Sequence, residues 1–278
     1  MREPNLIASS HRGKAKHKYQ FEESLRGKKM GVLSQIVSGI ENKPPVLCVH
    51  GTGGVGKTTL ATSGEKSLLL PVEEGWGTLD IERLPLVTTF ADYSAAVSAL
   101  RQDEHDYRIL ALDSLDWLEP LVWQETLRRY PRPGVDTIEG YGYGKGFLHA
   151  CEIWRELLGD LKALRDERNM AIVVIAHSEI KTFNDPTAES YDRFQIKLNK
   201  QASALVFEWA DAVLFASFDT KIKREERRGQ IINKGTSSGK RRLFCEERPA
   251  FQAKNRYNLP PEIDMDWQSL TQLIKGIK

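Results

Sequence analysis

Residues 46–60 read VLCVHGTGGVGKTTL, and this stretch decides the fold. Its apolar start is typical of a buried strand, and the glycine-rich turn after it opens a helix. Gly51 to Thr58 match the phosphate-binding pattern G-x-x-x-x-G-K-[ST] in full. Backbone N–H groups of such a loop and the positive end of the helix meet phosphate oxygens, whereas a glycine-rich turn without a ligand is the alternative. The nucleotide-binding residues predicted from this motif are Gly51, Thr52, Gly53, Gly54, Val55, Gly56, Lys57, Thr58 and Thr59.

A magnesium site is expected beside this loop. Residues 109–113 read ILALD, and four apolar residues that end in an aspartate match the second nucleotide-binding motif, in which Asp113 holds Mg²⁺ through its water shell. The hydroxyl of Thr58 is the other expected metal ligand, and Lys57 is expected to reach the β- and γ-phosphates during catalysis. An aspartate that caps the following helix is the alternative for Asp113.

The group that orients the attacking water must lie elsewhere, because a serine follows Asp113. Glu73 comes after the apolar run 68–72, and a carboxylate at the end of a neighbouring strand could polarise water opposite the γ-phosphate. Glu74 is the rival. A solvated turn at 73–75 is the alternative to both.

The fold class follows from apolar runs that alternate with helical patterns. We predict strands at 46–49, 68–70, 86–87, 109–112, 171–176 and 212–216, and helices at 92–100, 116–129 and 147–168. Leu33, Ile36, Val37 and Ile40 predict a further helix that Pro44 and Pro45 end. Continuous apolar strands separated by helices indicate an α/β fold, a mainly parallel sheet covered on both faces. Glycines between 215 and 256 favour antiparallel strands added near the C-terminal edge.

Composition places the chain among ordinary soluble proteins. Of 278 residues, 40% are hydrophobic and 28% charged, which disfavours collagen-like and wholly disordered classes. The apolar run 171–176 is far shorter than the roughly 20 residues that span a membrane, and the polar N-terminus does not resemble a signal peptide. Cys48, Cys151 and Cys245 lie far apart, so neither a disulfide framework nor a zinc site is indicated. We expect a cytoplasmic protein without a membrane partner.

The charges are segregated. Residues 1–30 carry eight basic and three acidic side chains, and residues 221–242 carry nine and two, which leaves a net charge of −10 on the rest. Contact with a polyanion is one interpretation, and solvated surface is the other. We therefore expect a basic flexible tail at 1–30, an ATPase core at 31–262 with a basic insertion at about 221–242, and a short C-terminal helix at 263–278.

GTGGVGKTT, Glu73, LALDS at 110–114 and AIVVIAHSEIK at 171–181 together resemble the RecA-core ATPases. The sequence is most similar to the phage and prophage RecA-core nucleotide-binding proteins associated with single-strand annealing, over about 43–261. The resemblance implies a RecA-like P-loop NTPase core that uses ATP and Mg²⁺, in host cytoplasm if phage-encoded. It puts His177 at the γ-phosphate sensor position, with a hydrogen-bonded strand-end histidine as the alternative.

Residues 254–256 read KNR and look like the K-x-R element with which related oligomers reach a neighbouring subunit's γ-phosphate. This resemblance implies that Lys254 and Arg256 are catalytic and that the chain forms a ring or filament with ATP at subunit interfaces. A solvated pair of cations is the alternative.

Two segments are expected to face DNA, again by resemblance: the loop after the helix that follows Asp113, and the loop after the sensor strand. Both mix aromatic side chains with cations, which suits sequence-tolerant binding of single strands. The candidate DNA-binding residues are Tyr141, Tyr143, Lys145, Lys181, Arg193, Phe194, Lys197 and, in the basic insertion, Arg241 and Arg242. A single-strand-binding protein is a further expected partner.

Three functions follow from these features. We favour an ATP-hydrolysing protein that acts on single-stranded DNA in recombination, annealing or replication. A P-loop phosphotransferase would instead need a substrate pocket and no polymer surface. A scaffold switched by ATP would need nucleotide binding alone.

Overall fold

The computed structural model describes residues 32–39, 41–187, 189–227 and 230–276, and side chains within this set except for Ser34 and 220–237. The basic tail expected at 1–30 lies outside the described residues. The chain divides into two compact units, Met1–Glu41 and Asn42–Lys278.

The first unit corrects one expectation. In place of a helix over 33–40, its described residues form a single 3₁₀ turn, η1 (Val32–Gln35), and 36–39 are not helical. The apolar side chains of Val32, Leu33, Ile36 and Val37 are all exposed. A short helix is stable only when its apolar face packs against other residues, and the described residues of this unit offer no such packing.

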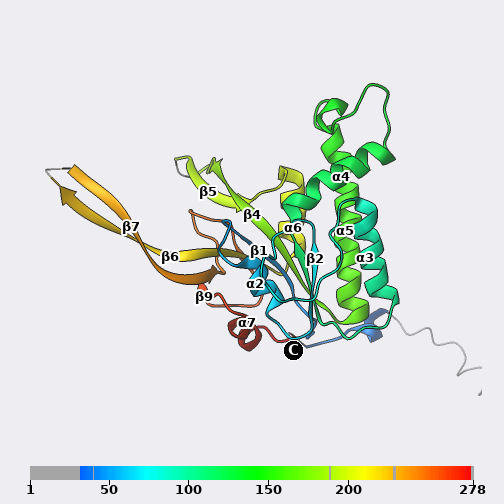
Figure 1. Cartoon of the computed structure of the whole chain (residues 1–278), viewed down its shortest axis with the longest axis horizontal. Coiled ribbons are helices and arrows are strands. Elements are labelled where there is room, and N and C mark those ends of the chain that lie inside the picture. Colours follow the sequence, from blue (N-terminus) through cyan, green and yellow to red (C-terminus); the bar gives the residue numbers. More distant parts are fainter. Residues whose placement is uncertain (1–31, 40, 188, 228–229, 277–278) are drawn as a thin grey trace, which may run out of the picture. The chain divides into compact units, whose positions relative to one another are not determined.

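The second unit is built on a mainly parallel sheet, as predicted, with strand order β2-β3-β4-β1-β6-β7-β9 (Figure 1). The five parallel strands are β1 (Val46–Gly51), β2 (Ser67–Pro71), β3 (Ile109–Asp113), β4 (Ala171–Phe183) and β6 (Ala212–Arg227). The expected strand at 86–87 is wrong. The N–H of Val87 donates to the carbonyl of Pro71, but this segment only runs along the edge of β2 as a loop.

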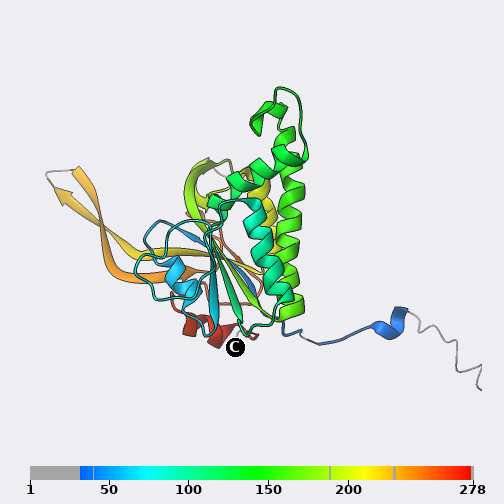
Figure 2. The same cartoon turned by 45° about the vertical axis from the view of Figure 1, so that its right-hand side comes forward.

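Helices cover both faces of the sheet (Figure 2). Alternate residues of each strand point to opposite faces, so Leu68 and Leu70 join one buried cluster while Leu69 joins the other. The first cluster lies under α3 (Phe90–Gln102), α4 (Leu115–Arg129), α5 (Lys145–Arg168) and α6 (Lys200–Trp209). The second lies under α2 (Lys57–Thr62) and α7 (Trp267–Leu273). Among the described helices, none is long and apolar enough to cross a bilayer.

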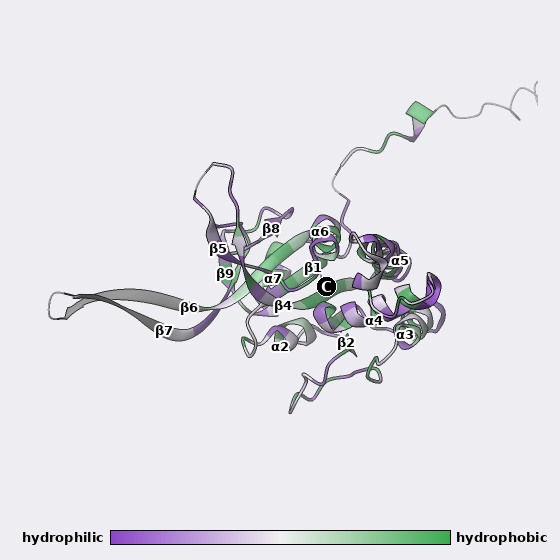
Figure 3. Ribbon diagram, turned by 90° about the horizontal axis from the view of Figure 1, so that it is seen from above, coloured by the Kyte–Doolittle hydropathy of each residue, from purple (hydrophilic) through white to green (hydrophobic). Residues whose placement is uncertain are grey.

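Antiparallel strands extend the sheet where the glycine-broken sequence predicts them. β7 (Gln230–Phe244) pairs with β6 along its length, β8 (Lys254–Asn255) pairs with β6, and β9 (Glu262–Asp264) pairs with β7. β6 is bonded to β1 only as far as Ala216, and within the described residues 217–227 pair with β7 alone. The β6–β7 pair therefore continues beyond the sheet as a two-stranded ribbon, which we call the arm (Figures 1 and 3).

Candidate functional site: a phosphate-binding edge

The phosphate-binding loop leaves the end of β1 and turns directly into α2. Gly54 and Gly56 have φ values of 74° and 96°, which L side chains rarely adopt. A Cβ on Gly51 would collide with the carbonyl oxygen of Ala216 in β6, so only glycine fits there. These backbone demands explain why the motif needs its glycines, and they direct the loop's N–H groups over the carboxyl ends of the strands.

The side chain of Lys57 is buried over the same loop. Its Nζ donates to the carbonyl oxygens of Gly51 at 3.1 Å and Thr52 at 3.0 Å. Burial lowers the pKa of Lys57, and the nearby carboxylates of Asp113, Asp116 and Glu73 oppose this effect. The ammonium therefore donates to neutral carbonyl oxygens within a loop that suits anions. A phosphate would offer it stronger, charge-assisted hydrogen bonds.

Thr58 and Asp113 meet as the magnesium prediction requires. The Thr58 hydroxyl donates to Oδ2 of Asp113 at 2.6 Å, and burial raises the pKa of that carboxyl. Within the described part of the chain, no cluster of three or more His, Cys, Asp or Glu side chains could hold a metal unaided. A hydroxyl and one carboxylate fit Mg²⁺, which binds few protein oxygens and takes the rest of its shell from phosphates and water.

Glu73 and Glu74 lie differently. Oε1 of Glu73 accepts a hydrogen bond from the Ser114 hydroxyl at 2.9 Å and lies 3.9 Å from Nδ1 of His177. The side chain of Glu73 is 17% exposed, whereas Glu74 points to solvent. Strand register explains why Glu73 lies beside Asp113. Pro71 at the end of β2 pairs with Asp113, and the N–H of Glu73 donates to the Asp113 carbonyl.

His177 is hydrogen-bonded to Asp116, an aspartate that no sequence motif indicated. Asp116 accepts hydrogen bonds from the backbone N–H of His177 at 2.9 Å and, at Oδ2, from its Nδ1 at 3.0 Å. The hydrogen bond to Asp116 raises the pKa of His177; burial alone would raise the pKa of Asp116, but the bonds from His177 lower it. Only its place in the first turn of α4, three residues after Asp113, could have signalled Asp116.

The K-x-R pair lies at the end of α6. Nζ of Lys254 donates to the carbonyls of Phe207, Glu208 and Ala210, so this amine caps the helix C-terminus. Arg256 is more open: its side chain is 54% exposed and lies 3.5 Å from Asp211.

The first expected DNA-facing segment lies at the end of the α4–α5 pair (Figure 1). Tyr141 closes the 3₁₀ turn η2 (Glu139–Tyr141), is buried, and donates its hydroxyl hydrogen to the carbonyl of Tyr130. Tyr143 is fully exposed, and Lys145 is exposed at the start of α5. Tyr143 and Lys145 are thus open to a ligand, while the ring of Tyr141 is enclosed by protein.

The second segment is a hairpin instead of the expected loop. β4 continues past the sheet edge and pairs antiparallel with β5 (Tyr191–Ile196). Arg193 is buried, pairs with Glu247 at 2.7 Å and lies 4.0 Å from the ring centre of Phe183. Phe194 is half-buried and stacks on the buried ring of Phe215. Arg193 and Phe194 are adjacent and face opposite sides of the hairpin, yet both pack against protein, so these two DNA-binding candidates have structural contacts.

The two other candidates in this hairpin region keep exposed ammonium groups. Lys181 pairs with Glu179 at 2.7 Å and is 45% exposed, and Lys197 lies 3.8 Å from Asp116 and is 57% exposed.

Arg241 and Arg242 belong to β7 at the root of the arm, where they have different surroundings. Arg242 pairs with Asp264 of β9 at 2.6 Å. The guanidinium of Arg241 lies against Gly56 of the phosphate-binding loop.

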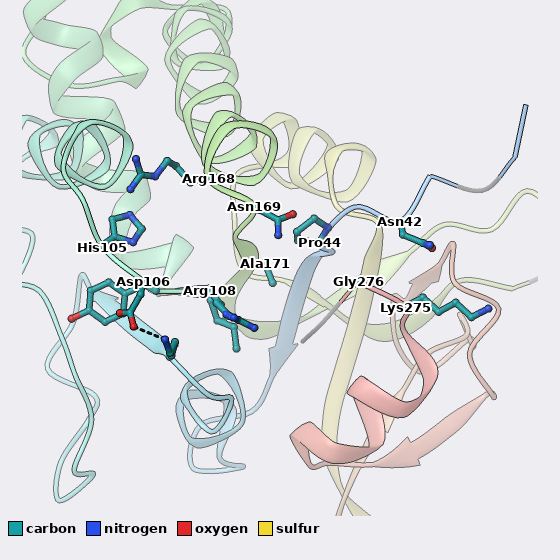
Figure 4. Close-up of a pocket in the computed structure, with 13 residues that line it drawn as sticks. Asn42, Pro44, His105, Asp106, Arg108, Arg168, Asn169, Ala171, Lys275 and Gly276 are labelled. Atoms are coloured by element: carbon teal, nitrogen blue, oxygen red, sulfur yellow. Dashed lines mark hydrogen bonds and ion pairs between the residues drawn. The ribbon is translucent and has the colours of Figure 1, made fainter. Parts of the chain in front are cut away.

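A cavity of about 640 Å³ lies at the opposite end of the parallel strands, where these strands begin (Figure 4). Lys66, Arg108, Arg168 and Lys275 line it, with Asp106 bonded to Lys66. Because the phosphate-binding loop follows the carboxyl end of β1, this cavity is not part of the nucleotide site.

A phosphate-binding loop on a parallel sheet, with a strand-terminal aspartate beside it, defines a P-loop ATPase domain. The chain belongs to the family described as AAA domain, which matches residues 43–257. No curated protein matches the chain. Among solved structures, it is similar to the crystal structure of the RadB recombinase, with 15% identity over 73% of this chain and 87% of that chain and a TM-score of 0.40.

Proposed function

We propose that the protein hydrolyses ATP with Mg²⁺ and acts on single-stranded DNA, in phage recombination, annealing or replication. The observation that carries the ATPase part is the gathering of Lys57, Thr58, Asp113 and Glu73 at one edge of the sheet. Absence of a membrane-crossing helix among the described residues accords with the cytoplasmic location that we also propose.

In this proposal each side chain has one task. Lys57 neutralises charge on the β- and γ-phosphates, and Thr58 and Asp113 hold the metal. Bound Mg²⁺ would neutralise phosphate charge as the terminal group is transferred. Glu73 orients and deprotonates water, since its carboxylate is fixed by Ser114 and points to the edge where Asp113 lies.

His177 is proposed to sense the γ-phosphate. It is bonded to Asp116, lies near Glu73, and its carbonyl accepts the N–H of Lys197 just after the β4–β5 hairpin. A shift of the His177 imidazole would therefore displace a segment that we propose to contact DNA.

The DNA part of the proposal is supported by surfaces beyond the sheet. Exposed Tyr143 offers a stacking face, and Lys145, Lys181 and Lys197 offer exposed cations. The arm carries most of the basic segment 221–242, and cations of such a segment can follow the phosphates of a single strand. For Arg256 we propose contact with the ATP of a neighbouring subunit in a ring or filament, while Lys254 would have to leave its helix cap to do the same.

The test is phosphate release from Mg·ATP with and without single-stranded DNA, with duplex DNA and single-stranded RNA as matched polymers. We expect single-stranded DNA to raise the rate most. Hydrolysis that no polymer stimulates would refute the DNA part and favour a phosphotransferase. Annealing that survives Glu73→Gln would favour a scaffold that needs ATP binding but not hydrolysis.

A further inference from the structure

Two glycines of the phosphate-binding loop touch the root of the arm. Gly51 packs on the backbone of Ala216 in β6, and Gly56 packs under Arg241 in β7. A Cβ built on Gly56 would lie 2.6 Å from Nη1 and 3.4 Å from Cζ of Arg241, so the guanidinium covers that glycine closely. The arm and the phosphate cradle are therefore in direct contact.

The guanidinium of Arg241 has no hydrogen bond or ion pair to any other described side chain or carbonyl, and its backbone carbonyl accepts the N–H of Met265. Its neighbour Arg242 is bonded to Asp264 instead. A guanidinium presents five N–H donors in a planar fork that suits phosphate. Here those donors lie beside a loop built for phosphate, which also holds Lys57.

We infer that Arg241 binds the α- and β-phosphates of the nucleotide held by its own subunit. The inference rests on the proposed ATP binding. The α- and β-phosphates are indicated because the N–H groups of the loop cradle these two, whereas Lys57 after Gly56 reaches towards the β- and γ-phosphates. Arg241 is then a nucleotide-binding residue and not one of the DNA contacts expected from the sequence.

The test compares equilibrium binding of fluorescent ADP and ATP by the full chain and two variants. Arg241→Gln removes the proposed contact, and Lys240→Gln removes one charge from the adjacent, exposed position of the same strand. We expect Arg241→Gln to weaken ADP and ATP binding alike, by about tenfold, as for loss of a charge-assisted hydrogen bond. Lys240→Gln should change neither by more than about twofold. Arg241→Lys, which keeps the charge without the planar fork, should fall between Arg241→Gln and the unmodified chain.

Three results would overturn the inference: unchanged nucleotide affinity in Arg241→Gln, a loss confined to ATP, or an equal loss in Lys240→Gln. Thermal unfolding of each variant identifies a variant that has lost its fold, in which case Arg241→Lys decides the matter. Failure of the proposed function is separate, because it would abolish nucleotide binding in the unmodified chain as well.

Discussion

At the carboxyl edge of the sheet, side chains from three separate segments converge on a small volume, whereas the segments proposed to face DNA divide their side chains between surface and interior. The ammonium of Lys57 lies near the carboxylates of Asp113 and Glu73 at that edge, and each carboxylate accepts a hydrogen bond from a neighbouring hydroxyl. In the segments proposed to face DNA, Tyr143 is fully exposed, but Phe194 is half-buried and stacks on Phe215. Charged side chains that converge on one place indicate a ligand site. A sequence that mixes aromatic residues with cations is less specific, because such residues can also pack against each other inside the protein.

The largest effect should follow from Glu73→Gln. The amide keeps the shape of the side chain but cannot accept a proton from water, so the hydrolysis rate should fall roughly 100- to 10,000-fold with little change in ATP affinity. Steady-state phosphate release and nucleotide binding measure the two quantities. Glu74→Gln is the matched control, and a greater loss of rate there would move the catalytic role by one residue.

Lys57→Ala should lower ATP turnover by roughly 100- to 1,000-fold, because it removes the cation that stabilises charge on the phosphates. The same assay measures it. Lys66→Ala is the control, since that lysine lines the cavity at the opposite end of the parallel strands. Turnover at the unmodified rate by folded Lys57→Ala would refute the site.

The side chain of Glu119 makes the stability of the folded protein depend on pH. Burial raises its pKa from 4.5 to about 7, although both carboxylate oxygens accept the N–H of Asn199 at 3.0 Å. The folded state therefore holds this proton more tightly than the unfolded state. Its contribution to stability is complete below about pH 4.5 and is lost as the pH rises through 7.

Glu119→Gln cannot ionise, so between pH 5 and 8 the unfolding free energy of the unmodified chain should fall relative to the variant by at most about 3 kcal/mol. Urea denaturation at a series of pH values measures the difference. Glu65→Gln, at an exposed position, is the control. An identical pH dependence in the unmodified chain and Glu119→Gln would show that Glu119 is not a buried acid.

The smallest effect concerns the DNA-facing surface. Tyr143→Leu should weaken binding of labelled single-stranded DNA by roughly tenfold, because stacking contributes about 1–3 kcal/mol per base. Tyr143→Phe keeps the ring and should bind within about twofold of the unmodified chain. Fluorescence anisotropy measures both. Equal affinities for all three proteins would remove Tyr143 from the proposed surface.

The sequence predicted those parts of the molecule that a few adjacent residues determine. Strand, phosphate-binding loop and helix follow one another within 46–62, and Asp113 ends its own strand, so their geometry is local. The pairing of Asp116 with His177 joins positions 61 residues apart and could not be read from either segment. The contact of Arg241 with Gly56 likewise depends on how the strands are ordered in the sheet.

The expectations that failed also depended on tertiary packing. The apolar spacing after residue 32 predicts a helix, but a helix of that length needs a surface to cover it. The segment after the sensor strand was expected to be a loop from the family resemblance, but it pairs with the end of β4 as a hairpin whose side chains pack partly against the protein.

The central claim is that the phosphate-binding loop and Asp113 form one Mg·ATP site, and a Mg²⁺ titration of phosphate release tests it most directly. We predict that Asp113→Asn raises the Mg²⁺ concentration for half-maximal release by at least about tenfold, while nucleotide affinity without Mg²⁺ stays unchanged. An unaltered Mg²⁺ requirement in folded Asp113→Asn would contradict the account.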